Sequence, residues 1–65
     1  MTITQIRAFY LAATLGSFTA AAEYMGLTQP TISELVRKVE DQYGMALFVR
    51  RGRRLVLTTA GQALM

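Results

Sequence analysis

Four arginines lie within five consecutive positions near the end of the chain, on both sides of Gly52. A guanidinium binds phosphate oxygens through several N–H groups at once, so a cluster of arginines on a small folded domain indicates a partner that carries phosphate. Nucleic acid is the first such partner to consider, and an anionic membrane surface is the second. The candidates for phosphate contacts in this cluster are Arg50, Arg51, Arg53 and Arg54.

The side chains that enzymes and metal sites use most are missing. The sequence has no histidine and no cysteine, so it lacks the commonest general base, the commonest metal ligand and any thiolate. The four carboxylates, Glu23, Glu34, Glu40 and Asp41, lie in no evident apolar pocket, and no hydroxyl has a base beside it. We predict that the chain is not an enzyme and has no catalytic residue, no metal site and no cofactor.

Length and composition predict one small folded domain. A chain of 65 residues has a small core, and a hydrophobic fraction of 52% is too high for a disordered segment. The longest nearly apolar run, residues 8–15, is far shorter than the roughly 20 residues that span a membrane. No secretory signal is visible, and the lack of cysteine suits a reducing compartment, so we expect a cytoplasmic protein with no membrane partner.

The spacing of apolar residues predicts a first helix over about residues 3–15, ended by Gly16. The positions that share one face of this helix are Ile3, Ile6, Phe9, Tyr10 and Ala13. We expect this face to lie in the core.

A second helix is predicted over residues 18–25, with Ser17 as its N-terminal cap. Its alanines at 20–22 either let another helix cross closely or reflect only the high helix propensity of alanine. The next residues, Gly26-Leu27-Thr28, form a short connection typical of a helix-turn-helix. We expect Leu27 to fill the core between the two helices.

The third helix is predicted over residues 29–43 and ends at Gly44. Thr28 is a better N-terminal cap than Thr31, because Pro30 then lies in the first turn, where its missing N–H costs nothing. The expected core face of this helix comprises Ile32, Val36, Val39 and Tyr43. The opposite face comprises Pro30, Ser33, Glu34, Arg37, Lys38 and Asp41.

After residue 44 the apolar pattern changes from that of a helix to that of strands. Residues 45–49 and 55–57 are short apolar runs, and residues 50–54 form a glycine-centred turn between them, which predicts a β-hairpin. A hairpin directly behind a helix-turn-helix is a wing, and Thr58 caps a last helix. The predicted fold is mainly α with a small β-hairpin: a winged helix-turn-helix with three helices, a two-stranded wing and the start of a linker helix.

These elements resemble the N-terminal winged helix-turn-helix domain of LysR-type bacterial transcriptional regulators. The similarity extends over residues 1–61 in the same order and without gaps. The matching segments are Gln5-Ile6-Arg7-Ala8-Phe9, Gly16-Ser17-Phe18-Thr19-Ala20-Ala21-Ala22, Thr28-Gln29-Pro30-Thr31-Ile32-Ser33, Val39-Glu40, Gly44, Leu47-Phe48, Arg50 and Leu57-Thr58-Thr59-Ala60-Gly61.

The resemblance implies sequence-specific binding to double-stranded operator or promoter DNA, and control of transcription. The DNA-binding domain would span residues 1–58, with the helix-turn-helix at about 18–37 and the wing at about 45–57. Residues 59–65 would begin a linker helix, cut short here, that pairs two subunits into a homodimer or a larger assembly. An effector domain normally follows in such proteins and is not in this chain.

In this class of motif the N-terminal end of the second helix contacts base edges, and cations contact phosphates. Gln29 suits an adenine edge, and Pro30 or the methyl group of Thr31 suits a thymine methyl group. The candidates for base contacts are Gln29, Pro30, Thr31, Ser33 and Glu34. The candidates for the DNA backbone and the wing are Thr28, Arg37, Lys38, Arg50, Arg51, Arg53 and Arg54. We expect Arg53 to lie at the wing tip. For Arg50, the alternative to a phosphate contact is a structural role.

The sequence departs from the family pattern at Glu34 and Leu35, where polar or basic residues are usual. A carboxylate at residue 34 repels phosphates unless it accepts from a cytosine amino group, and Leu35 offers only apolar contact.

Three other interpretations stay open from the residues alone. The first turn of the third helix is, in the plainest interpretation, an ordinary solvated turn. A small helical dimerisation module is the second, because the last helix is expected to pair with another subunit. A module for anionic membrane surfaces would carry its cations along one long helix opposite a broad apolar face, whereas most cations here lie on a turn.

Overall fold

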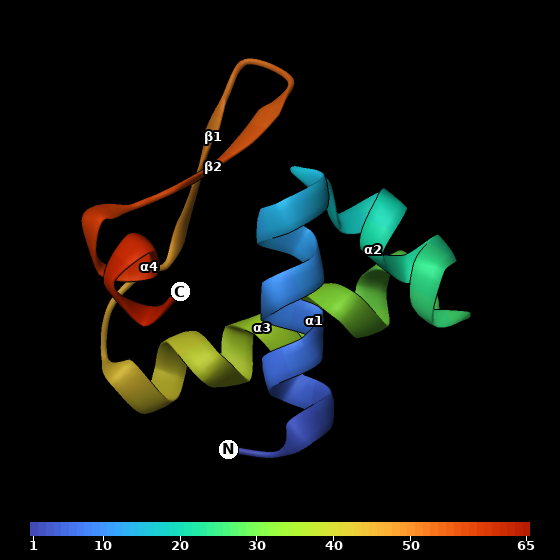
Figure 1. Ribbon diagram of the computed structural model, residues 1–65, viewed down its shortest axis with the longest axis horizontal. Coiled ribbons are helices and arrows are strands. Elements are labelled where there is room, and N and C mark those ends of the chain that lie inside the picture. Colours follow the sequence, from blue (N-terminus) through green and yellow to red (C-terminus); the bar gives the residue numbers. More distant parts are fainter.

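The computed structural model describes residues 1–65, which form four helices and one antiparallel hairpin. The elements are α1 (Ile3–Leu15), α2 (Phe18–Met25), α3 (Gln29–Tyr43), β1 (Phe48–Arg51), β2 (Arg54–Leu57) and α4 (Thr59–Leu64). The first three helices pack on one another, and the hairpin extends away from them (Figure 1). None of the helices has both the length and the apolar composition to cross a membrane.

The helices begin and end at the predicted residues because their caps are local. The hydroxyl of Ser17 accepts from the N–H of Ala20 at 3.0 Å and starts α2. Thr28 accepts from the N–H of Thr31 at 3.3 Å, which confirms Thr28 as the cap of α3 and leaves Pro30 in its first turn.

The core between α1, α2 and α3 is built largely from alanines. Ala8 and Ala12 of α1 and Ala21 and Ala22 of α2 are buried beside Ile32 of α3. Small side chains let the three helices approach closely, which confirms the packing interpretation of the alanines in α2.

The prediction for the core face of α1 is wrong: of its five residues only Phe9 is buried. Ile3 is 76% exposed, Ile6 and Tyr10 are about half exposed, and Ala13 is half-buried. The face that packs on α2 and α3 is the neighbouring one with the small residues, because only that face allows the close approach. Ile3, Ile6 and Tyr10 therefore form an apolar stripe on the surface of α1.

Two further predicted core residues lie at the surface. Tyr43 is 45% exposed, because the buried positions of α3 end at Val39 and Tyr43 lines an open groove with Ile6 and Tyr10 of α1. Leu27 is 38% exposed: its N–H donates to the carbonyl of Ala22 in the turn, while the neighbouring Met25 packs on the core.

The strands differ from the predicted hairpin in their position along the chain. β1 begins only at Phe48, so residues 45–47 are not strand, and of the four arginines around Gly52 only Arg53 lies outside the strands. The turn consists of Gly52 and Arg53, and Gly52 has φ +61°, as the first position of a tight type II′ hairpin turn requires. The predicted five-residue turn is therefore two residues long.

Leu47, the residue before β1, joins three elements through its backbone. Its N–H donates to Oε2 of Glu40 on α3 at 2.8 Å, and the N–H of Phe48 donates to the same oxygen at 3.3 Å. Its carbonyl oxygen accepts from the N–H of Thr58, the cap of α4, at 2.9 Å. The root of the hairpin is thus tied to α3 on one side and to α4 on the other.

Gly61 lets α4 lie directly on this junction. A Cβ atom at residue 61 would stand 2.2 Å from the carbonyl oxygen of Leu47 and 2.8 Å from Cδ2 of Leu57. The N–H of Gly61 donates to the hydroxyl of Thr58, which in turn donates to the carbonyl of Ala46 at 2.7 Å. Only a residue without a side chain permits this contact.

Candidate nucleic-acid interface

Three arginines at the end of the hairpin are exposed and have no acidic partner. Arg51 and Arg54 are directly opposite each other in the strand register, and Arg53 lies in the turn between them. Every ion pair in the structure involves Arg37 instead, so none neutralises this wing tip. Like charges directly opposite in an antiparallel pair repel, and a bound polyanion would remove that repulsion.

Arg50 lies on the other face of the hairpin. Its guanidinium carbon is 5.9 Å from the centre of the Phe18 ring, and Phe18 in turn packs edge-to-face on Phe48 with 5.6 Å between ring centres. Phe48 also packs on Phe9 of α1 at 5.4 Å. Of the two roles predicted for Arg50, the contact with α2 favours the structural one.

The first turn of α3 holds its polar side chains in a defined arrangement. Nε2 of Gln29 donates to the hydroxyl of Ser33 at 2.8 Å, which leaves one N–H and the carbonyl oxygen of the amide free. The hydroxyls of Thr28 and Thr31 are bonded to each other at 2.9 Å, while Pro30 is exposed. The free donor and acceptor of Gln29 are the pair that an adenine edge requires.

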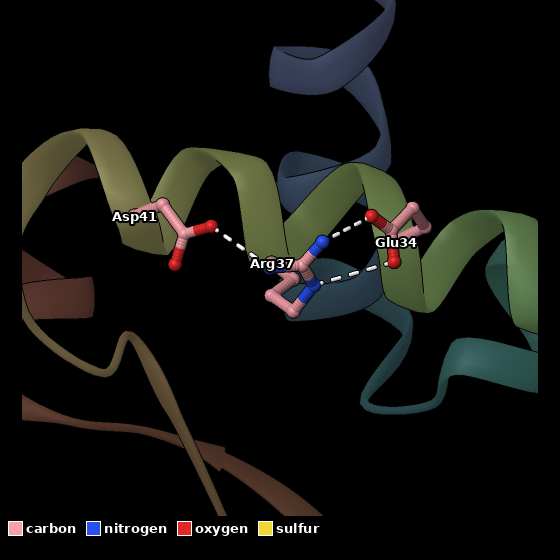
Figure 2. A network of polar contacts seen from close by, with 3 residues as sticks. All are labelled: Glu34, Arg37 and Asp41. Carbon is pink, nitrogen blue, oxygen red and sulfur yellow. Dashed lines mark hydrogen bonds and ion pairs between the residues drawn. The ribbon is translucent and has the colours of Figure 1, made fainter.

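The middle of the same exposed face carries an ion-pair network on Arg37 (Figure 2). Nε and Nη2 of Arg37 donate to the two carboxylate oxygens of Glu34, and Nη1 donates to Oδ2 of Asp41 at 2.9 Å. The hydrogen bond from Arg37 holds the pKa of Glu34 below its ordinary value, and the carboxylate raises that of Arg37. Lys38 beside them is exposed and makes no ion pair.

The sequence expectations for α3 place its polar residues on the correct face but miss these bonds. Arg37, the predicted phosphate contact, is instead paired with two carboxylates of its own helix. The spacing of three residues from Glu34 and four to Asp41 is the signal that predicts the network, because such residues are neighbours on a helix surface. Leu35 is half-buried and packs on the core rather than lying on the polar face.

A family model described as "bacterial regulatory helix-turn-helix protein, lysR family" matches residues 3–62. The chain belongs to the LysR family.

Individual regulators are also similar to this chain in sequence and in structure. The RuBisCO operon transcriptional regulator of Allochromatium vinosum is 44% identical over 62 residues, which are 95% of this chain and 20% of that protein. A LysR-family regulator from Eggerthella lenta superposes with a TM-score of 0.92 at 34% identity, covering 98% of this chain and 91% of that one. The DNA-binding domain of CbnR, solved with DNA, has a TM-score of 0.91 at 33% identity, covering 98% and 74%.

These similarities confirm the LysR resemblance and the winged helix-turn-helix fold. The family and its named members are regulators of transcription, in agreement with the prediction that the chain is not an enzyme. The chain spans about a fifth of the length of the curated relatives it matches first.

Proposed function

We propose that this LysR-family chain binds double-stranded DNA sequence-specifically and serves the regulation of transcription. α3 enters the major groove with its first turn, and the wing lies on the backbone or in the minor groove. The observation that carries the proposal is the wing tip, where Arg51, Arg53 and Arg54 stand exposed without an acidic partner and two of them repel each other. The solved complex of the similar CbnR domain with DNA supports it.

Within this proposal the residues divide into two groups. Gln29, Pro30, Thr31, Ser33 and Glu34 face base edges, with Ser33 also positioning the amide of Gln29. Thr28, Lys38, Arg51, Arg53 and Arg54 contact the backbone, while Arg50 supports the hairpin from its inner face. Phosphate contacts position the domain and base contacts select the sequence.

The remaining expectations concern the division of the chain into domains and its assembly. We propose a DNA-binding domain over residues 1–58 and a linker helix that begins at residue 59 and pairs two subunits. The exposed apolar stripe of α1 supports a subunit contact, because Ile6 and Tyr10 line an open groove with Tyr43, Leu64 and Met65. Bacterial operators lie in the cytoplasm, which is therefore the proposed location.

The purified chain is expected to bind duplex DNA with an affinity that falls steeply with salt. If the three arginines of the wing tip and Lys38 each neutralise a phosphate, the logarithm of the binding constant falls with the logarithm of salt with a slope of about −3.6. Fluorescence anisotropy with a labelled duplex from about 50 to 200 mM salt measures this slope.

Arg53→Ala is the matched variant for this measurement. It should weaken binding to every duplex about equally and make the slope shallower by about 0.9, because one phosphate contact is lost. Absent binding at low salt, or binding that salt does not affect, would refute the proposed function.

Gln29→Ala is expected to cost about 1–3 kcal/mol at a single base pair and little elsewhere, because Gln29 offers the donor and acceptor that an adenine edge pairs with. Selection from a random duplex library yields the preferred site, and a panel of single base-pair changes in that site then locates the loss. Ser33→Ala should weaken the preference at the same base pair, because the amide of Gln29 then loses the hydrogen bond that positions it. An unchanged panel for Gln29→Ala would show that this residue contacts no base.

A further inference from the structure

We propose that Asp41 and Glu34 hold Arg37 away from the DNA backbone, and that this restraint lowers the affinity of α3 for duplexes of unrelated sequence. The inference rests on the proposed function, because it concerns the face of α3 that enters the groove. It gives Asp41, which lies nearly two turns beyond the last base-contact candidate, a role in specificity without contact to a base.

The carboxylates of Glu34 and Asp41 engage both sides of the Arg37 guanidinium. A guanidinium binds phosphate bidentately through one of two edges, and each edge contains a pair of N–H groups. Glu34 occupies the edge formed by Nε and Nη2, and Asp41 takes Nη1 of the other edge at 2.9 Å (Figure 2). Three of the five N–H groups of Arg37 thus donate to carboxylates, and a phosphate has to compete with Glu34 and Asp41 for this guanidinium.

The charges on this face act in the same direction. The two carboxylates and the guanidinium give this network one net negative charge, which the unpaired Lys38 beside it offsets, whereas the wing tip is positive and unpaired. A phosphate placed next to the carboxylates of Glu34 and Asp41 in a wrong register is repelled by them, and no base contact compensates for that repulsion. Repulsion of incorrect partners is a common source of specificity.

The network is well suited to a test by substitution. The side chains of Glu34, Arg37 and Asp41 are 52%, 56% and 63% exposed, and solvent-exposed ion pairs contribute little to folding stability. Loss of Asp41 should therefore leave the fold intact and release Nη1 of Arg37.

The experiment compares wild type, Asp41→Asn, Arg37→Gln and the double variant on one duplex of unrelated random sequence, by anisotropy across a salt series. Asp41→Asn should bind about threefold more tightly at 50 mM salt, with a slope steeper by about 0.9, because one more phosphate is neutralised. Glu23→Gln is the control: it removes the same charge from an exposed carboxylate of α2 that makes no ion pair, and it should have a smaller effect.

The double variant separates restraint from simple repulsion. If Asp41 acts through Arg37, the gain from Asp41→Asn disappears when residue 37 is glutamine. A gain that persists in that background, or no gain beyond that of Glu23→Gln, would overturn the inference while leaving the proposed function standing. A wild-type chain that binds no duplex at any salt would refute both.

Discussion

Gly61→Ala is expected to destabilise the chain by about 1–3 kcal/mol, the usual cost of an overpacked site. The added methyl group would stand 2.2 Å from the carbonyl oxygen of Leu47, and that oxygen is fixed by its bond from Thr58. Because the neighbour is backbone rather than a flexible side chain, α4 has to move away. Small domains have only a few kcal/mol of total stability, so the loss is large. Urea unfolding followed by circular dichroism measures it.

Helix propensity alone predicts that Gly61→Ala raises the free energy of unfolding, so the direction of the measured change distinguishes the two effects. Alanine is favoured over glycine in a helix by about 1 kcal/mol, so a Gly61→Ala variant as stable as wild type or more stable would disprove the close contact. Gln62→Ala serves as the matched control, because residue 62 is exposed in the same helix and its substitution should change stability little.

Glu40→Ala is expected to cost about 2–4 kcal/mol. One carboxylate oxygen accepts from two backbone N–H groups, those of Leu47 and Phe48, and both groups are partly buried. Hydrogen bonds to a charged group are worth more than neutral ones, and a buried N–H left without a partner adds its desolvation cost. The hairpin should also loosen, and faster amide hydrogen exchange at Leu47 and Phe48 would report it.

Two further variants serve as comparisons for Glu40→Ala. Glu40→Gln keeps a carbonyl oxygen in place and should lose about half as much stability as alanine, because the acceptor is then neutral. Glu23→Ala removes an exposed carboxylate with no partner and should change stability by less than about 0.5 kcal/mol. Equal stability of the Glu40 and Glu23 variants would show that the carboxylate does not anchor the hairpin.

The helix boundaries could be predicted because their determinants are local. Ser17 and Thr28 cap the helices that follow them, and Gly16, Gly26 and Gly44 each adopt the left-handed conformation that ends a helix. Each of these signals lies within a few residues of the boundary that it sets. The turn was less well defined, because four arginines around Gly52 give no sign of where strand pairing stops.

Side-chain environments depended on tertiary packing and were predicted less well. α1 carries large apolar residues on one stripe and alanines on the next, and apolar periodicity does not distinguish a stripe that is covered from one that is exposed. The roles of Glu40 and Gly61 depend on contacts with residues seven and fourteen positions away, at Leu47. The ion pairs within α3, by contrast, could be predicted from the sequence, because Glu34 and Asp41 lie three and four positions from Arg37.

The arrangement at Leu47 has a mechanical consequence. The residue bonds to α3 through its N–H and to α4 through its carbonyl oxygen, with Gly61 resting on it. A displacement of α4 is therefore transmitted through the backbone of Leu47 to the base of the wing, and through the carboxylate of Glu40 to the C-terminal part of α3.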